Sequence, residues 1–95
     1  MEIYDVIWKD VFVEKLASKH AIRIEEVEEV LFGKHHTRKV NRGNVEGEDV
    51  YVAYGQTESG RYLTIFFIWK YGTAALPISA RDMTQAERRY YHEQK

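Results

Sequence analysis

The sequence predicts an α+β fold in which helices pack against a small antiparallel sheet of about four to five strands. Apolar residues recur every three to four positions up to Gly33, which is a helical period, and at every second position after it, which is a strand period. A capping pattern that begins at Thr84 then returns the chain to a helix. We expect two N-terminal helices, a meander of strands and one C-terminal helix, all in a single domain over residues 1–95.

The N-terminal third predicts one short strand and two helices. Ile3–Trp8 alternates weakly, Asp10 is expected to cap the first helix, and Gly33 is expected to end the second. Each helix carries an apolar stripe at a spacing of three or four residues. The stripes are Phe12 with Leu16 and Val13 with Ala17 on the first helix, and Ile24, Val27, Val30 and Leu31 on the second, whose opposite face carries Glu25, Glu26, Glu28 and Glu29.

The meander is expected to contain four strands. Tyr62–Trp69 is apolar almost throughout, which is typical of a central strand covered on both faces. Pro77 donates no ladder hydrogen bond, so its strand should lie at an edge or carry a bulge there. Asn41–Gly47 has the composition of a turn. The expected strands are His35–Arg42, Val50–Tyr54, Tyr62–Trp69 and Thr73–Ser79.

The last helix has a clear start signal. Thr84 and Glu87 fit a capping box, in which the hydroxyl accepts from the Glu87 amide and the carboxylate reaches back. We expect this helix to run to about His92 and to face the core through Ala86 and Tyr90.

Composition excludes several classes of protein and site. The chain has no cysteine, which rules out disulfides and thiolate metal sites and fits a cytoplasmic protein. The first residues carry acids where a signal peptide needs bases, and the run Leu63–Trp69 is too short to span a bilayer. His35 and His36 would point to opposite faces of a strand, which does not suit one shared ion. No H-E-x-x-H motif or His-rich cluster occurs either, and we expect neither a metal nor another cofactor. The absence of nucleophile-elbow and P-loop motifs excludes hydrolases of those families.

Charge is distributed unevenly along the chain. The net charge is −1, but residues 1–32 hold eight acids and four bases, whereas residues 33–95 hold ten bases and seven acids. The stretch Gly33–Arg42 has four bases, two histidines and no acid. Such a field could present one face to an anion and the other to a basic partner, and the alternative is a solvated surface of mixed charge.

Basic and aromatic side chains are expected to meet at one end of the sheet. If neighbouring strands are antiparallel, Arg61, Tyr62 and Arg81 converge there, and Lys70 is a less certain member. The last helix adds Arg88, Arg89, Tyr90, Tyr91 and His92. This helix is either an ordinary exposed basic helix or part of a site. His20, at the end of the first helix, is likewise either a packing residue or a functional one.

Metal-free RNA cleavage matches the chemistry of these residues. The neighbouring 2′-OH serves as nucleophile, so the protein has to move protons and stabilise a phosphorane with cationic donors. Arginine suits the second task because its planar fork matches phosphate. Histidine, lysine or tyrosine can move protons, and aromatic rings can stack on unpaired bases.

The order and spacing of several short segments resemble the BrnT family of toxins from type II toxin–antitoxin systems. The segments are Trp8, Lys19-His20-Ala21-Ile22, the helix Glu25–Phe32, Gly47-Glu48-Asp49-Val50-Tyr51, Gly60-Arg61-Tyr62-Leu63, Ile78-Ser79-Ala80-Arg81 and Glu87-Arg88-Arg89-Tyr90. The resemblance implies a RelE-like fold and a metal-independent ribonuclease that inhibits growth. It also implies an antitoxin of the ribbon-helix-helix type, through which alone the toxin contacts promoter DNA.

Two positions differ from the usual family pattern. Arg23 stands where a serine is usual, and Leu76 stands where a basic residue is usual. The family reading predicts a catalytic set of Arg61, Lys70, Arg81, Arg88, Arg89 and Tyr91, and RNA contacts from His20, Tyr62, Tyr90 and His92. Arg81 and Arg88 are assigned to the phosphate, and Tyr91 or Lys70 to proton transfer. The alternatives are a weak or inactive module that only binds an antitoxin or RNA, and a structural subunit without a nucleic-acid role.

Overall fold

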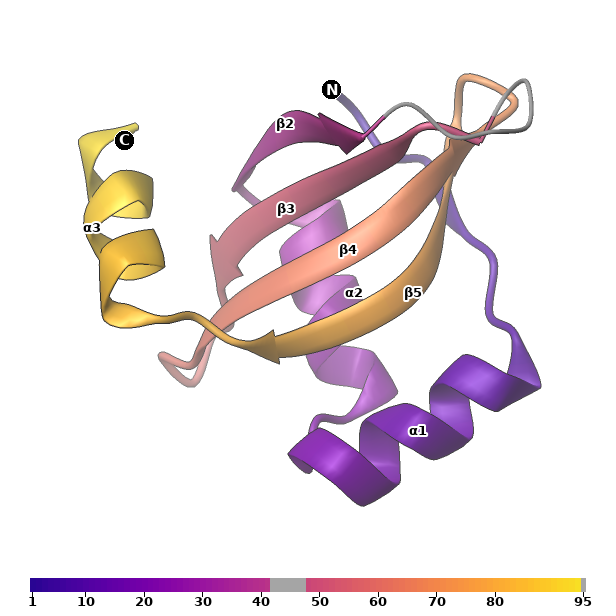
Figure 1. The fold of residues 1–95 in the computed structure, drawn as a ribbon, viewed down its shortest axis with the longest axis horizontal. Helices are drawn as coiled ribbons and strands as arrows, with labels where there is room; N and C mark the ends of the chain where they lie inside the picture. Colours follow the sequence, from indigo (N-terminus) through magenta and orange to yellow (C-terminus); the bar gives the residue numbers. More distant parts are fainter. Residues whose placement is uncertain (42–47, 95) are drawn as a thin grey trace.

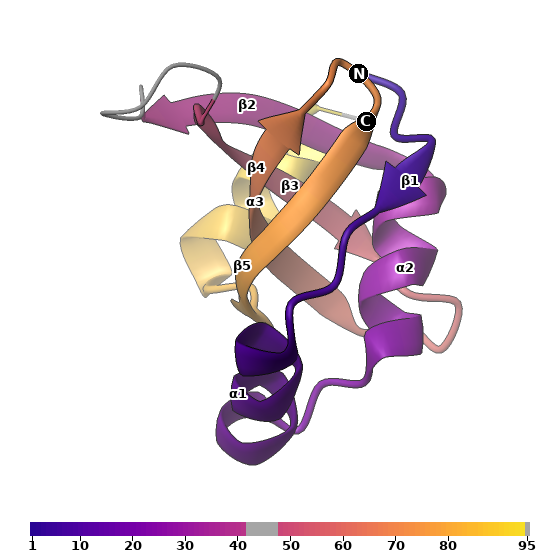
Figure 2. The ribbon, with the colours of Figure 1, turned by 90° about the vertical axis from the view of Figure 1, so that its right-hand side faces the viewer.

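The chain folds into one five-stranded sheet with two helices on one face and a third helix at one end of the other face (Figure 1). The structure is a computed structural model that describes residues 1–41 and 48–94, without the side chains of His20 and Asn41. Figure 2 shows α2 and α3 on opposite sides of the sheet. The elements are β1 (Asp5–Val6), α1 (Asp10–His20), α2 (Ile24–Phe32), β2 (His35–Asn41), β3 (Val50–Gln56), β4 (Tyr62–Lys70), β5 (Ala74–Asp82) and α3 (Gln85–Glu93).

The sheet has the strand order β1-β5-β4-β3-β2, and it is mixed rather than antiparallel throughout. β2 to β5 form the predicted antiparallel meander, but β1 pairs in parallel with β5, with Asp5 opposite Ala74. A parallel pair needs a long crossover, and residues 7–73 supply it here. The α+β class is therefore confirmed, and the expectation of a purely antiparallel sheet is corrected at its first strand.

The main core lies between the sheet and the layer formed by α1 and α2. α1 buries Phe12 and Leu16 as predicted, but it begins at Asp10 with Lys9 as N-cap, and Ala17 is exposed. α2 matches its predicted stripe, except that Glu26 is buried although it was expected on the polar face. The buried residues that α2 and β4 contribute are Val27, Val30 and Leu31, and Leu63, Ile65 and Phe67.

β5 is longer than predicted and contains a bulge. The expected end at Ser79 is wrong because β4 is long enough to continue the ladder, and Arg81 pairs with Thr64. The register shifts so that Ser79 and Pro77 pair with consecutive residues of β4, which leaves Ile78 as the extra residue of a bulge. Of the two alternatives expected at Pro77, an edge or a bulge, the structure has the bulge, since β5 lies between β1 and β4. Side chains alternate along a strand. Arg81 therefore faces α3, and Asp82 faces the layer of α1 and α2.

The face of the sheet that carries α3 is covered only in part. β4 was predicted to be covered on both faces, but Phe66 and Ile68 on the α3 side are half-buried, because α3 packs only at the Tyr62 end of the strand. The predicted turn residues Arg42–Gly47 lie outside the described part of the chain. No helix among the described residues is both long and apolar enough to cross a bilayer.

Candidate active site

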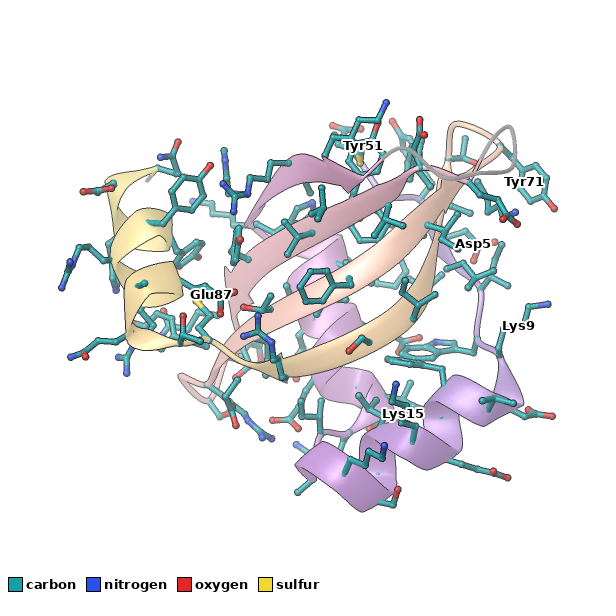
Figure 3. All side chains as sticks on the ribbon, in the orientation of Figure 1. Asp5, Lys9, Lys15, Tyr51, Tyr71 and Glu87 are labelled. Carbon is teal, nitrogen blue, oxygen red and sulfur yellow. The ribbon has the colours of Figure 1, made fainter. Side chains whose placement is uncertain are left out.

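The site is built around the start of α3. Thr84 caps the helix: its hydroxyl accepts a hydrogen bond from the Glu87 amide at 3.1 Å, and the Glu87 carboxylate accepts one from the Thr84 amide at 2.8 Å. This capping box was predicted from the sequence. Figure 3 shows Glu87 in the space between α3 and the sheet. The cap therefore orients the carboxylate towards the strands.

Glu87 binds Arg81 as well as its own helix terminus. The guanidinium donates to both carboxylate oxygens, at 2.6 and 2.8 Å, and the hydroxyl of the buried Thr64 donates at 3.1 Å. Burial alone would raise the pKa of Glu87, but the hydrogen bonds from Arg81, Thr84 and Thr64 outweigh it and hold the pKa at about 2. The hydrogen bond to Glu87 in turn raises the pKa of Arg81. This pair fixes β5 to α3.

The helical period places the remaining side chains of α3 in three directions. At about 100° per residue, Glu87 and Tyr91 point inward, Tyr90 lies on one flank, and Arg88 and His92 lie on the other. The helix is anchored by Tyr91, which is 6% exposed, together with Met83. The predicted anchor Ala86 is exposed, because it lies one step outside this inward face. Arg89 is exposed on the side opposite the sheet.

Tyr62, the first residue of β4, gathers three side chains of α3. The Arg88 guanidinium carbon lies 4.1 Å from the centre of its ring. The rings of His92 and Tyr91 meet Tyr62 edge-on, with centroids 5.4 and 6.2 Å away. Burial, and next the neighbouring Tyr62, raise the pKa of Tyr91, so its hydroxyl keeps its proton. The result is a cation, an imidazole and two phenols in one small cluster.

Tyr90 contacts the other flank of the sheet. Its hydroxyl lies 3.1 Å from Nε2 of His36, and the Arg38 guanidinium carbon lies 4.9 Å from its ring centre. Tyr54 meets the same ring edge-on at 5.5 Å. Aromatic and cationic side chains therefore lie along both flanks of α3, and the cation on this flank comes from β2.

Arg61 and Lys70 lie apart from these clusters. Arg61 is at the same end of the sheet but on the side of α1 and α2, where it binds Asp82 at 2.7 Å, Glu26 at 3.2 Å and the Ala21 carbonyl at 3.0 Å. Lys70 pairs with Glu48 at 3.2 Å. It ends the nine-residue β4 that Tyr62 begins, a separation of roughly 25 Å at the usual rise per residue. Catalytic roles for Arg61 and Lys70 stay predictions.

Two further positions that the sequence singled out are placed by the backbone. His20 ends α1, and its side chain lies outside the described part of the chain. Leu76 pairs with Ile68 on the α3 side of the sheet, two residues from Lys70 along β4 and five residues before Arg81 along β5. A cation at position 76 would therefore lie towards the Lys70 end rather than beside Arg88. Among the described residues, no group of three His, Asp or Glu side chains is placed to hold a metal ion.

Sequence reasoning missed Thr64, His36, Arg38 and Tyr54, and it gave Glu87 only a capping role. A signal for His36 and Arg38 was present in the sequence. They are two residues apart on β2, so their side chains point to the same face of the sheet as those of their partners in β3. The partnership of Glu87 with Arg81 carries no local signal, because it depends on how far β5 extends.

Comparisons with known proteins agree with this architecture. The model of a family described as "Ribonuclease toxin, BrnT, of type II toxin-antitoxin system" matches residues 8–87. Among solved structures, the chain is similar to the crystal structure of the Brucella abortus ribonuclease toxin BrnT, with a TM-score of 0.60 and 17% identity. That match covers 85% of this chain and 97% of the other, and it shows a shared fold. No curated protein matches. The predicted resemblance is confirmed: the chain belongs to the BrnT family of ribonuclease toxins of type II toxin–antitoxin systems.

Proposed function

We propose that this toxin is a metal-independent endoribonuclease that cuts unpaired RNA at the Tyr62 end of the sheet. The observation that carries the proposal is the stack of the Arg88 guanidinium on Tyr62, with His92 against the same ring. Arg88 has no carboxylate partner among the described residues, so its N–H donors can meet a phosphate. By contrast, both terminal nitrogens of the Arg81 guanidinium already donate hydrogen bonds to the Glu87 carboxylate.

These contacts support a division of roles. Arg88 binds the scissile phosphate and stabilises the phosphorane, while Tyr62 orients Arg88 and stacks on a neighbouring base. His92 takes the proton from the 2′-OH, because imidazole suits proton transfer near neutral pH. Tyr91 keeps its proton and acts as a hydrogen-bond donor. Arg81 is a positioning residue, since it fixes α3 through Glu87.

The proposed reaction is a transesterification. The 2′-oxygen loses its proton and forms a new bond to phosphorus, and the bond from phosphorus to the 5′-oxygen breaks. The proton goes to that 5′-oxygen. The products are one RNA end with a 2′,3′-cyclic phosphate and one with a 5′-hydroxyl. The protein needs cationic donors and a proton carrier for this step, and Arg88 and His92 are groups of those kinds.

The test compares Arg88→Gln with Lys15→Gln, which removes one positive charge from α1, well away from α3 (Figure 3). We expect Arg88→Gln to lower the cleavage rate of a single-stranded RNA by about 10²-fold or more, as for loss of a transition-state donor. Lys15→Gln should cleave like wild type, and excess EDTA should leave all rates unchanged. Equal rates for the two variants, or loss of cleavage in EDTA, would refute the proposal.

Membership of a type II toxin family implies an antitoxin partner. We propose that this antitoxin is of the ribbon-helix-helix type, that it neutralises growth inhibition in the cytoplasm, and that the toxin reaches promoter DNA only through it. Expression of the chain with and without a candidate antitoxin of that type tests this. Growth arrest by the toxin alone, relieved by the antitoxin, is the expected outcome.

A second candidate function is a weak or inactive module that only binds its antitoxin or RNA. The observation that favours it is the engagement of Arg81 and Arg61 by carboxylates, together with Leu76 in place of a cation. RNA binding without cleavage by the folded wild type would support this candidate.

A further inference from the structure

Two arginines in the described part of the chain rest on tyrosine rings instead of pairing with acids. Arg61 and Arg81 are bound by carboxylates. Arg88 lies over Tyr62, and Arg38 lies 4.9 Å from the ring centre of Tyr90, but neither forms an ion pair with a described residue. Arg88 belongs to the proposed cleavage site. Arg38 repeats its arrangement on the opposite flank of α3.

Strand alternation accounts for the position of Arg38. His36 and Arg38 are two residues apart on β2, so both point to the face of the sheet that carries α3. Their partners in β3 are Tyr54 and Val52, and Tyr90 packs onto this surface from α3. β2 is an edge strand, and Arg38 is exposed. The side chain is therefore accessible from solvent.

The Arg38 guanidinium retains most of its hydrogen-bonding capacity. It has five N–H donors, and one of its terminal nitrogens donates to the Tyr54 hydroxyl at 3.3 Å. Stacking on Tyr90 occupies the flat face of the group, while its edge stays available for a phosphate. The His36 ring, 5.5 Å from Tyr90, adds a second flat surface beside it. A cation with adjacent aromatic faces suits a phosphate and its unpaired base.

This surface is continuous with the proposed cleavage site. Tyr90 and Tyr91 are consecutive residues of α3, and Tyr54 pairs across the sheet with Thr64, which binds Glu87. A groove of about 910 Å³ is lined both by His36 and by Tyr91, a residue of the Tyr62 cluster. Lys34, Gln56 and Gln94 also line it, as do Glu29 and Glu58, whereas Arg38 and Tyr90 lie outside its lining. The two clusters are therefore neighbours, joined through α3 and through the pairing of β3 with β4.

We infer that His36, Arg38, Tyr54 and Tyr90 form a second RNA subsite, which binds an unpaired nucleotide next to the one that is cleaved. Arg38 takes its phosphate, and the rings of His36 and Tyr90 take its base. The subsite deepens the proposed function, since it presupposes an RNA substrate. It supplies binding and no proton transfer, so its loss weakens RNA binding without slowing the chemical step.

The test uses a 2′-O-methylated single-stranded RNA, which lacks the nucleophile and so reports binding alone. We expect Arg38→Gln to raise its Kd by about tenfold relative to Lys15→Gln, as for loss of one stacked contact. The slope of log Kd against log salt should fall by about 0.7, the value for one phosphate of a single strand. Arg38→Lys keeps the charge but loses the flat stack, so it should keep the slope and lose part of the affinity. Single-turnover cleavage of unmodified RNA at saturation should be unchanged in both variants.

The subsite and the cleavage proposal can fail separately. If Arg38→Gln binds the methylated RNA like Lys15→Gln, or weakens only the complex with the antitoxin, the subsite inference is wrong. A slower saturating cleavage rate with unchanged binding would also overturn it. If wild type cuts no RNA while Arg38→Gln still weakens binding, the subsite stands and the cleavage proposal fails. Circular dichroism of each variant checks that the fold is retained.

Discussion

Glu87 shows how one carboxylate can serve two structural tasks. It closes the cap of α3 through the Thr84 amide, and it holds the guanidinium of Arg81 on the neighbouring strand. Each donor lowers the pKa of the carboxyl, which the burial of the group would otherwise raise. Stability that comes from a carboxyl with a lowered pKa is present above its unfolded pKa and is lost as the pH falls through the folded one.

We therefore predict that wild type loses stability as the pH falls from about 4.5 to about 2, and that Glu87→Gln removes much of this dependence. At neutral pH the variant should be less stable by about 2 kcal/mol, because Arg81 and Thr64 lose a charged acceptor. Urea unfolding at several pH values measures both effects. Identical pH profiles for the two proteins would contradict the assigned role of Glu87.

At the scale of elements, α3 depends on its cap and on its anchor. A nine-residue helix is marginal by itself in water, so its order comes from tertiary contacts and from the ends. Its inward face offers Tyr91 and Glu87, and its other side chains are exposed or half-buried. Arg88, Tyr90 and His92, which are proposed to contact RNA, are on this helix, so their positions depend on its stability.

Thr84→Ala should weaken α3 and the site together. The variant loses the hydroxyl that accepts from the Glu87 amide, which typically costs about 1 kcal/mol. We expect faster hydrogen exchange of the α3 amides and a smaller loss of protection in β3 and β4. Thr84→Ser keeps the acceptor and is the matched control. If both variants exchange alike, the cap does not limit the order of the helix.

At the scale of the whole molecule, Arg61 links the two layers. It joins the connection between α1 and α2, the buried Glu26 of α2, and Asp82 at the end of β5. The layer of α1 and α2 carries most of the acids of residues 1–32, whereas α3 and β2 carry the cations proposed to bind RNA. The acids of that layer and the two arginines proposed to bind RNA are therefore on opposite faces of the sheet.

Arg61→Ala should lower the free energy of unfolding by about 2 kcal/mol, because Glu26, whose side chain is 8% exposed, loses a partner. Arg23→Ala is the matched control, since Arg23 lies 3.9 Å from the same carboxylate but is 70% exposed. Its expected cost is under about 0.5 kcal/mol. Equal costs would contradict a linking role for Arg61. The cleavage rate per folded molecule of Arg61→Ala then tests its predicted catalytic role.

Local patterns predicted much of this molecule. The stripe of α2 and the capping box of α3 follow from neighbouring residues, and both are present. Pro77 indicated an edge or a bulge, and the structure has the bulge. Arg61 and Arg81 were expected to meet, yet they lie on opposite faces, because the faces depend on the register between β4 and β5. Likewise, the buried Glu26 binds Arg61, a partner 35 residues away that no local period reveals.

The bulge in β5 has a consequence for chain length. Phe66 pairs with Ser79 and Phe67 pairs with Pro77, so two consecutive residues of β4 pair with the residues on either side of Ile78, and Ile78 itself has no partner in the ladder. Removing Ile78 would leave every pair, and the direction of every side chain, unchanged, whereas removing a residue elsewhere in β5 would turn all those beyond it to the other face. A variant of this chain without Ile78 would therefore exchange a bent strand for a straighter one and still carry Arg81 opposite Thr64.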